Sequence, residues 1–383
     1  MSGILMVAGE PSGDRHAAEL ARVLRARLPQ VRLWGMGGEH MAREGVELLV
    51  DIRGLSVVGI SEVLGHVGSI LSARKAILRE VDREAPLLGI LIDFPDFNLW
   101  LARGLRGRGI PLLYYIAPQV WAWRKGRVRS MARLLDRVAA ILPFEEEILR
   151  RAGIAAEYVG HPLLEQVNGM MSREDARTLL GFPPDTSILG LFPGSRPGEV
   201  NRLLPIMLRA VKLAQAEIPD MKPVVALSTL VPRDRVEGPI RECGVEVEVV
   251  TGEAHTVMRA SKMAVVASGT VTLEAAMLET PILVIYRTSW ITYLVGRLLA
   301  TVQHVALVNV LARERIVPEL LQWSATPRAV CSELLDLWGD EGACNHMIRR
   351  LRQVAASLGS RAASRRTADM VLEMLSSKGN GGS

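Results

Sequence analysis

The stretch ILGLFPGSRPGEVNRLLPIML (residues 188–208) contains the three parts of a strand-turn-helix unit. Ile188 to Phe192 is a short apolar run bounded by a turn, which is typical of a buried strand. Pro193-Gly194-Ser195 follows as a tight turn, and Glu199 to Leu208 repeats apolar residues at helical spacing. A helix that starts after such a turn presents unpaired backbone N–H groups, which favour an anion. Arg196 adds a guanidinium suited to phosphate or carboxylate; an ordinary turn with a solvated arginine is the alternative.

The same unit recurs along the chain, where short apolar segments alternate with helical patterns. This alternation predicts parallel sheets covered by helices on both faces. A polar, Gly- and Pro-containing stretch near residue 165 separates two such series and predicts two Rossmann-like domains; from about Thr326 onward the pattern is wholly helical. The predicted strands are Ile4–Ala8, Val31–Met36, Leu87–Asp93, Leu112–Ala117, Arg137–Leu142 and one near Tyr158, then Ser187–Phe192, Pro223–Leu227, Val245–Val250, Met263–Ala267 and Ile282–Ile285.

The composition is that of a soluble or peripheral globular protein. With 383 residues the chain has the length of about two domains, and its 49% hydrophobic and 23% charged residues are ordinary values. The net charge of +5 favours a negatively charged partner. The three cysteines are far apart and form no zinc-type pattern, so we expect neither disulfides nor structural zinc. No apolar run reaches the roughly 18 residues of a membrane span.

Ligands of open parallel sheets bind at the carboxyl ends of the strands, so the residues just past each strand are informative. After the first strand comes AGEPSGD (residues 8–14), where Gly9 and Gly13 allow close backbone approach and Ser12 or Asp14 can cap the following helix. This pattern is neither GxGxxG nor a Walker loop, which disfavours a nicotinamide dehydrogenase. After the third strand, Asp93 ends an apolar run, where a carboxylate is costly unless it is paired, hydrated or useful.

Two further segments contain residues that can bind a ligand. APQVWAWRKGRVRS (117–130) joins two tryptophans to four basic residues, which fits nucleic acid, an acidic ligand or a membrane surface. In VVASGTVTLEAAMLETPILVIYR (265–287), a short turn at Ser268-Gly269-Thr270 precedes a helix with Glu274 one turn in. Such a turn can hold a diphosphate while the carboxylate binds ribose hydroxyls. Simple helix capping by Thr270 and Glu274 is the competing interpretation.

Eight segments in one order give the chain a family resemblance. It resembles the lipid-A-disaccharide synthases, which are glycosyltransferases of the GT-B type, and the resemblance spans nearly the whole length. It implies two Rossmann-like domains with parallel sheets facing a central cleft: an acceptor and lipid-side domain of residues 1–165 plus about 360–383, and a UDP-sugar donor domain of residues 166–359. The matching segments are AGEPSGD, IDFPDFN, APQVWAWRKGR, LPFE, VGHPL, FPGSRPGEV, ASGTVTLE and NVLARERIVPELLQ.

The resemblance also implies the reaction. UDP-2,3-diacylglucosamine would donate its sugar to the 6-hydroxyl of 2,3-diacylglucosamine 1-phosphate, giving a β-1,6 disaccharide 1-phosphate and UDP with inversion. The sequence has no D-x-D triplet, so we expect no metal and no cofactor besides the UDP-sugar substrate. Arg196 and the helix end behind Ser268 would neutralise the departing diphosphate. Asp93 is the expected base for the acceptor hydroxyl.

Further site residues follow from the matched motifs. The resemblance places Gly194, Ser195, Ser268, Gly269, Thr270, Glu274, Arg287 and Asn309 at the donor, and Ser12, Gly13, Asp14, Gln119 and Trp121 on the acceptor side. His161 lies in VGHPL near the domain break, which suggests a hinge or cleft role. One segment departs from the family pattern: Val308 stands where relatives have proline, and Arg313-Glu314-Arg315 replaces Gly-Arg-Glu. The loop loses its glycine, so backbone contacts to the donor there are in doubt.

Both implied substrates carry acyl chains, so we expect peripheral contact with the cytoplasmic leaflet of the inner membrane. SEVLGHVGSILSARKAIL (61–78) and WITYLVGRLLATVQHVALV (290–308) are the candidate contact segments; for the first, a core-facing helix is the alternative. Nucleic acid is not expected as a partner, and the oligomeric state stays open. Two other hypotheses remain: another GT-B nucleotide-sugar enzyme, either a soluble-acceptor transferase or an epimerase, and a non-enzymatic binder of anionic lipid or nucleic acid.

Overall fold

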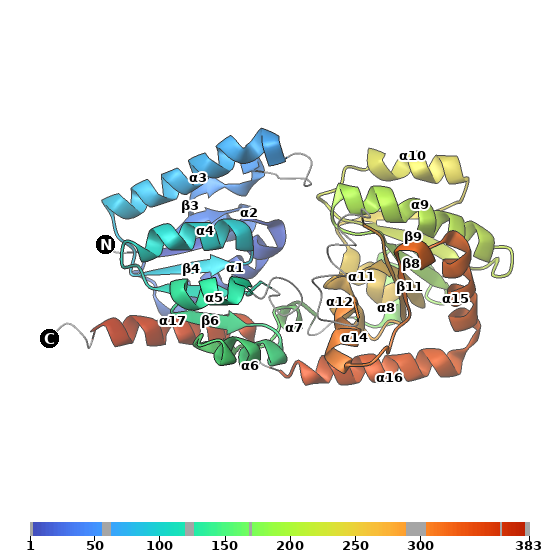
Figure 1. Ribbon diagram of the computed structural model, residues 1–383. Helices are drawn as coiled ribbons and strands as arrows, with labels where there is room; N and C mark the ends of the chain where they lie inside the picture. Colours follow the sequence, from blue (N-terminus) through green and yellow to red (C-terminus); the bar gives the residue numbers. More distant parts are fainter. Residues whose placement is uncertain are drawn as a thin grey trace. The chain divides into compact units, whose positions relative to one another are not determined.

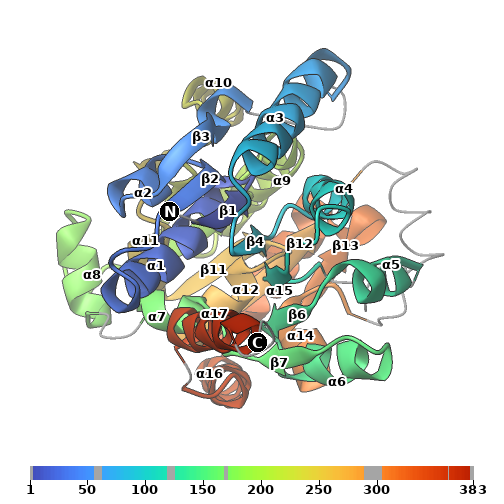
Figure 2. The ribbon, with the colours of Figure 1, turned by 90° about the vertical axis from the view of Figure 1, so that its left-hand side faces the viewer.

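The computed structural model describes residues 3–55, 63–118, 126–167, 171–288, 304–360 and 362–379. The chain divides into two compact units (Figures 1 and 2). Unit 1 comprises Met1–Gln166 and Leu358–Ser383, and unit 2 comprises Val167–Ser357. Each unit contains one parallel sheet with helices, which confirms the predicted α/β class with two parallel-sheet domains.

Unit 1 is built on a seven-stranded sheet in the order β3-β2-β1-β4-β5-β6-β7, with every neighbouring pair parallel. The chain reverses its direction of winding between β1 and β4, so ligands of such a sheet are expected there. Its strands are β1 (Ile4–Ala8), β2 (Leu33–Gly37), β3 (Glu47–Asp51), β4 (Leu88–Ile92), β5 (Leu112–Tyr115), β6 (Arg137–Ala140) and β7 (Ala156–Tyr158). Its helices are α1 (Pro11–Arg27), α2 (Glu39–Arg43), α3 (Val63–Arg83), α4 (Pro95–Arg106), α5 (Gly126–Leu134), α6 (Pro143–Arg151), α7 (Leu163–Val167) and α17 (Ala363–Gly379).

The strands of unit 1 are apolar on both faces because helices cover both. In β1, Leu5 and Val7 join one buried cluster with α3, α4 and α5. Ile4 and Met6 point the other way and join a second cluster with α1 and α17. This alternation is the period of two expected for a strand. A sheet covered on both sides explains the continuous apolar runs in the sequence.

Unit 2 repeats this plan with a six-stranded parallel sheet in the order β10-β9-β8-β11-β12-β13. Here the winding reverses between β8 and β11. Its strands are β8 (Ile188–Phe192), β9 (Lys222–Leu227), β10 (Glu248–Thr251), β11 (Met263–Ala267), β12 (Ile282–Tyr286) and β13 (Glu319–Leu321). Its helices are α8 (Arg173–Leu179), α9 (Pro197–Ala214), α10 (Asp234–Cys243), α11 (Ala254–Ala260), α12 (Val271–Met277), α14 (Leu307–Ala312), α15 (Pro327–Gly339) and α16 (Glu341–Ser357).

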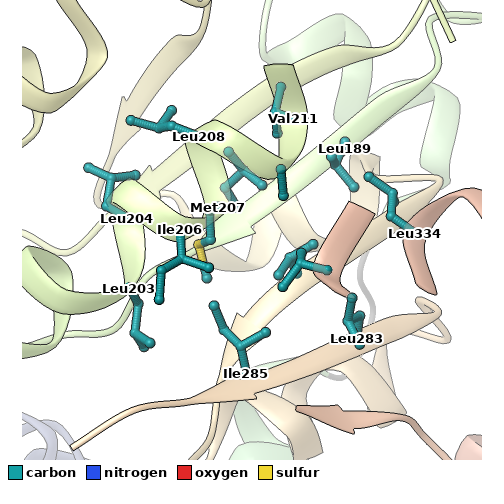
Figure 3. Close-up of a cluster of buried hydrophobic side chains, with 14 of the residues drawn as sticks. Leu189, Leu203, Leu204, Ile206, Met207, Leu208, Val211, Leu283, Ile285 and Leu334 are labelled. Atoms are coloured by element: carbon teal, nitrogen blue, oxygen red, sulfur yellow. The ribbon is translucent and has the colours of Figure 1, made fainter. Parts of the chain in front are cut away.

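The core of unit 2 lies between α9 and the strands beside it (Figure 3). The helical spacing seen in the sequence supplies the inner face of α9, where Leu204, Met207 and Val211 are fully or almost fully buried. These side chains pack with residues of β8, β12 and α15 in one cluster. The quoted stretch 188–208 therefore provides both a central strand and the main covering helix of this unit.

The C-terminal helix α17 belongs to unit 1 and lies beside α1 (Figures 1 and 2). Several polar contacts hold it there. Arg366 donates to Glu157 at 2.7 Å, and Arg137 donates to Glu373 at 2.5 Å. Ser364 donates to the Glu165 carboxylate through both its backbone N–H (2.9 Å) and its hydroxyl (2.8 Å). The last helix thus completes a unit that the first 166 residues begin.

Candidate functional site

The winding reversal in unit 1 brings two predicted segments together. Strands β1 and β4 are paired along their length, with Ala8 opposite Ile92, so AGEPSGD and Asp93 leave the sheet side by side. The contact between them is close: a β-carbon added to Gly9 would lie 2.0 Å from the ring of Phe94. Glycine is therefore required at this position for packing.

Asp93 sits in a strained but well-held backbone. Both Asp93 and Phe94 have a φ of +47°, a conformation that residues other than glycine rarely adopt. Asp93 donates its N–H to Tyr115 (3.1 Å), while its carbonyl accepts bonds from the Tyr114 hydroxyl (2.6 Å) and from Asn98 Nδ2 (2.7 Å). Asn98 is fully buried. Strain of this kind persists only where neighbouring groups over-determine it, and it is frequent at functional sites.

The first turn of α1 lies against Asp93. A β-carbon added to Gly13 would be 3.7 Å from the β-carbon of Asp93. Helix α1 begins at Pro11, so Gly13 belongs to its first turn, whose N–H groups favour negative charge. Ser12 is exposed in the same turn. Ser12, Gly13 and Asp93 are thus brought together at one sheet edge.

Asp14 has a different position from these neighbours. Its side chain is 2% exposed and accepts backbone bonds from Gly38 (2.7 Å), His40 (3.0 Å) and Met41 (3.2 Å). Gly38 is the N-cap residue of α2, so Asp14 caps α2. The expectation that Asp14 caps its own helix was therefore wrong, because the N-cap residue of α1 is Glu10. These bonds give Asp14 a structural function; its assignment to the acceptor side stays a prediction.

Two predicted acceptor-side residues, Gln119 and Trp121, lie outside the described residues, as does most of the segment 117–125. The candidate membrane segment 290–308 is likewise largely outside them. In the segment 61–78, Ala73, Ile77 and Leu78 are buried in the core of unit 1, whereas Leu71 is 50% exposed. Core packing therefore explains part of the helical spacing, and membrane contact through the exposed side of this helix stays a prediction.

Two histidines of unit 1 have lowered pKa values. His161 is 4% exposed, and burial, with a smaller contribution from His16, lowers its pKa to about 3. Burial likewise lowers the pKa of His16 to about 4, with Arg15 adding to the shift. His161 accepts a bond from the Leu163 N–H at 3.3 Å through Nδ1. His161 is therefore a neutral, buried group inside unit 1, and the hinge or cleft role stays a prediction.

In unit 2 the turn after β8 is occupied by a side chain that sequence reasoning missed. Gly194 has a φ of +115°, and a β-carbon added there would lie 2.4 Å from a carboxylate oxygen of Glu199. The Ser195 N–H donates to that same oxygen at 3.2 Å. Arg196, the N-cap residue of α9, is exposed beside it. The turn therefore already accepts an anion, and the sequence signal was an acidic residue in the first turn of the helix.

The turn after β11 faces the same sheet edge, because β11 pairs with β8 and with β12. Ser268 donates its hydroxyl to the Val305 carbonyl at 3.0 Å, and Thr270 is exposed. The space beside Gly269 is open: no described heavy atom lies within 4 Å of an added β-carbon. Arg287, just past β12, is exposed at the same edge. The predicted donor residues after β8, β11 and β12 are thus gathered at one edge.

Glu274 has a partner that the sequence did not reveal. His255 on α11 lies 3.3 Å from it, measured from Nε2 to Oε2. The His255 side chain is 26% exposed and the Glu274 side chain 16% exposed, so both keep access to solvent. An imidazole in this place can orient the carboxylate through a hydrogen bond.

Asn309 is fully buried, and its amide is saturated by the loop that follows it. Nδ2 donates to Val317 O (3.0 Å) and to Glu319 Oε1 (2.7 Å), while Oδ1 accepts from the N–H groups of Ile316 (2.8 Å) and Val317 (3.0 Å). An asparagine amide has no further capacity. Direct contact with a donor would require breaking one of these bonds, so the geometry favours a loop-holding function; donor binding by Asn309 stays a prediction.

The loop after α14 begins with a left-handed residue that is not glycine. Arg313 has a φ of +53° and ends α14 in the left-handed conformation that glycine adopts most easily. Arginine at this position therefore costs conformational energy that glycine would not.

The described residues contain no group of three or more histidine, cysteine, aspartate or glutamate side chains able to hold a metal ion. Within the same ranges, no helix combines the length and the apolarity needed to cross a membrane.

Comparisons with known proteins agree with this architecture. A sequence profile of the lipid-A-disaccharide synthetase family matches residues 4–371. The lipid-A-disaccharide synthase of Myxococcus xanthus is 46% identical over 372 residues, which are 97% of each chain.

Solved structures resemble the fold at low sequence identity. The UDP-GlcNAc 2-epimerase of Neisseria meningitidis, solved with UDP-GlcNAc bound, is 11% identical with a TM-score of 0.69, covering 97% of this chain and 100% of that one. A calicheamicin glycosyltransferase is 14% identical with a TM-score of 0.60, covering 98% of each chain. These likenesses confirm the expected GT-B fold class. The profile match over nearly the whole length and the 46% identity show more: this chain belongs to the lipid-A-disaccharide synthetase family.

Proposed function

We propose that this chain transfers 2,3-diacylglucosamine from UDP to the 6-hydroxyl of 2,3-diacylglucosamine 1-phosphate, giving the β-1,6 disaccharide 1-phosphate of lipid A biosynthesis and UDP. The observation that carries the proposal is the family match from residue 4 to residue 371, because it includes every strand end described above. The specific substrates follow from the family; the roles of individual residues are argued from their geometry.

Asp93 is the proposed base that removes the proton of the acceptor hydroxyl. An inverting transfer needs such a group on the acceptor, and a carboxylate with a fixed position meets this requirement best. Three hydrogen bonds hold the Asp93 backbone, and the first turn of α1 lies against it. The side chain is partly exposed and thus accessible to a substrate.

Arg196, Gly194 and Ser195 are proposed to bind the diphosphate of the donor and to stabilise the charge that grows on UDP. A guanidinium beside backbone N–H donors supplies this stabilisation without a metal. The bond from the Ser195 N–H to Glu199 supports the proposal, because the turn already accommodates a carboxylate oxygen. Ser268, Gly269, Thr270 and Arg287 are proposed to complete this site from the neighbouring turns.

Glu274 is proposed to accept bonds from the ribose hydroxyls of the donor. A carboxylate that is only 16% exposed keeps two directed acceptor oxygens with little freedom. His255, 3.3 Å away, is the group that orients it. The acceptor-side roles of Ser12, Gly13, Gln119 and Trp121 are carried forward on the family motifs.

We also propose that α3 contacts the cytoplasmic leaflet of the inner membrane. A hollow of about 380 Å3 lies beside α3 and is lined by Leu71, Arg74, Lys75 and Trp100 among others. Leu71 is 50% exposed, and the Arg74 guanidinium lies 4.3 Å from the Trp100 ring centroid. Apolar and basic side chains together suit the lipid interface. Leu71→Asp should weaken binding to phospholipid vesicles, whereas Leu213→Asp, at an exposed leucine of α9, should not.

The test of the reaction is the release of UDP from UDP-2,3-diacylglucosamine with and without the diacyl acceptor. We expect release only when 2,3-diacylglucosamine 1-phosphate is present, together with formation of the disaccharide. UDP release with a soluble, non-acylated acceptor would instead favour another GT-B transferase. A change of sugar configuration without any acceptor would favour an epimerase. Binding of lipid or nucleic acid with no turnover of the donor would favour the non-enzymatic hypothesis.

A further inference from the structure

Unit 1 contains a second hollow that the proposed reaction does not use. It has a volume of about 500 Å3 and is lined by Arg103, Arg129, Ser130, Arg133 and Leu134. Arg103 comes from α4 and the other four residues from α5. Three guanidinium groups therefore surround one open space, and Arg129 and Ser130 belong to the basic segment singled out in the sequence.

These three arginines have no carboxylate partner among the described residues, in contrast with their neighbours. On α4, Arg106 donates to Asp136 at 2.6 Å; just beyond the helix, Arg108 binds both oxygens of Asp82, at 2.6 and 2.9 Å. Asp136, the nearest acid in sequence to α5, is occupied by Arg106 and by the N–H of Leu112 (2.8 Å). The two nearest arginines, Arg106 and Arg108, are thus neutralised, whereas the three that line the hollow are not.

Such an arrangement is unfavourable without a ligand. Arg129 and Arg133 are four residues apart on α5, so their charges lie on the same face and repel each other. Arg103 adds a third positive charge across the hollow. An anion in the hollow would turn this repulsion into attraction, and the guanidinium fork fits the oxygens of a phosphate particularly well. Ser130 adds a hydroxyl donor.

The hollow is separate from the proposed catalytic edge of unit 1. A helix that follows a parallel strand runs back toward the other end of the strands. Asp93 lies just before the start of α4, so the C-terminal end of α4 points away from Asp93. Arg103 and Arg133 both lie in the last turns of their helices. A ligand in this hollow would therefore leave the Asp93 edge accessible.

We propose that this hollow is a binding site for a phosphate group, either on the headgroup of an anionic phospholipid or as free phosphate. The chemistry is the same in both cases: phosphate oxygens accept hydrogen bonds from Arg103, Arg129 and Arg133. The space exceeds that of a single phosphate, which leaves room for the remainder of a headgroup. The proposal does not rest on the glycosyl transfer, and its test measures binding alone.

The test compares two variants of equal charge. R103Q/R129Q/R133Q removes the three guanidiniums of the hollow; R209Q/R235Q/R328Q removes three exposed arginines of unit 2 that have no carboxylate partner among the described residues. Each is titrated with inorganic phosphate against chloride of the same ionic strength, followed by thermal shift. Each is also sedimented with phosphatidylcholine vesicles with and without phosphatidylglycerol.

We expect the first variant to lose the phosphate-dependent thermal shift and to bind the anionic vesicles at least about tenfold more weakly than the second, since each basic residue near an anionic surface contributes several-fold. Loss of the vesicle effect alone identifies the lipid headgroup as the ligand; loss of the phosphate effect alone identifies free phosphate. Equal behaviour of the two variants with both probes overturns the proposal. If the triple variant does not fold, R129Q alone against R209Q alone decides it by the same criteria.

Discussion

The carboxyl edges of the two sheets are built in different ways. In unit 1, Asp93, Phe94 and Ile116 all adopt positive φ although none is glycine. In unit 2, the corresponding turn after β8 places glycine, Gly194, at positive φ, and the space beside Gly269 is open. A residue other than glycine in this conformation costs about 1 kcal/mol or more. The turns after β8 and β11 therefore avoid the strain that the Asp93 turn stores, whereas Gln322, just past β13, also has a φ of +50°.

This difference indicates two kinds of site. The strained edge is held by side-chain bonds from Tyr114 and Asn98, which fix the backbone carbonyl of Asp93. The glycine-containing edge offers backbone N–H groups and free space, which suit a large polyanionic ligand. In the proposed reaction, unit 1 would act through one side chain, Asp93, and unit 2 through several backbone and side-chain donors.

The largest expected effect tests the single side chain of unit 1. Asp93→Asn keeps the shape of the residue but removes its ability to accept a proton, so we expect kcat to fall at least about a hundredfold. Steady-state release of UDP in the presence of the diacyl acceptor measures it. Asp96→Asn, at an exposed residue three positions along, should change kcat by no more than about twofold. A near-normal kcat in the folded Asp93→Asn variant would mean that Asp93 is not the base.

The next effect tests the charge at the edge of unit 2. Arg196→Ala should lower kcat by about a hundredfold, because the diphosphate loses its principal cation during departure. Arg196→Lys should recover only part of the rate, since an ammonium lacks the two-pronged geometry. The control is Arg209→Ala, which removes an exposed arginine of the same helix. An equal loss in that control would mean that net charge, and not this position, is responsible.

A third prediction concerns acid stability, in which the units should differ. The pKa values of His16 and His161 are lowered to about 4 and about 3, so the folded state stays neutral while the unfolded chain takes up protons below pH 6.5. Stability is thus fully present above pH 6.5 and is lost as the pH falls toward those values. Each histidine contributes about 1.4 kcal/mol per pH unit, giving a loss of roughly 2–3 kcal/mol between pH 7 and 5.5.

Hydrogen exchange of peptides from each unit, measured at both pH values and corrected for intrinsic rates, locates this loss. We expect it in peptides of unit 1, and His16→Gln should remove about half of the pH dependence. If hydrogen exchange in unit 1 did not change between the two pH values, the neutral state of the two histidines in the folded protein would be contradicted.

The fourth prediction separates strain from simple stability. Tyr114→Phe removes the hydroxyl that holds the Asp93 carbonyl and should cost about 1 kcal/mol of unfolding free energy. Tyr158→Phe is a matched control, because its hydroxyl donates to the Leu358 carbonyl at the same 2.6 Å. Denaturant titrations should give similar losses for both, but kcat should fall only in the Tyr114 variant. Equal kcat values would show that the held backbone does not position Asp93.

The smallest effect relieves strain in unit 2. Arg313→Gly places glycine at a φ of +53° and should stabilise the protein by about 0.5–1 kcal/mol, measured by denaturant titration. The converse substitution, Gly181→Ala, introduces a side chain at a φ of +82° where space is open, and should destabilise by a similar amount. A loss of stability in Arg313→Gly would mean that the arginine side chain makes a compensating contact.

Much of the fold was predictable because a parallel sheet leaves a strong pattern. Every predicted strand has a counterpart, within about three residues, since buried strands need continuous apolar runs. The two missed strands are edges: β3 carries the 41% exposed Leu49 between charged residues, and β13 has only three residues. At an edge the burial that creates the pattern is incomplete.

The candidate site was predictable only in part. Residues just past each strand were identified because parallel strands end at a common edge. Their partners Asn98, Glu199 and His255 were not, because each comes from a helix and meets the site only through packing. Asp14 and Asn309 lie in family motifs, yet both have side chains engaged in internal hydrogen bonds. A motif does not distinguish a polar group that binds a loop from one that binds a ligand.

The return of α17 to unit 1 has a consequence for synthesis of the protein. The ribosome makes the helix that covers α1 after all of unit 2, although β1 is among the first residues produced. Unit 2 is therefore able to finish folding before unit 1, although unit 1 begins earlier in the chain. Until the final residues emerge, an apolar surface of the earlier half stays open, and chaperones have their longest opportunity to bind there.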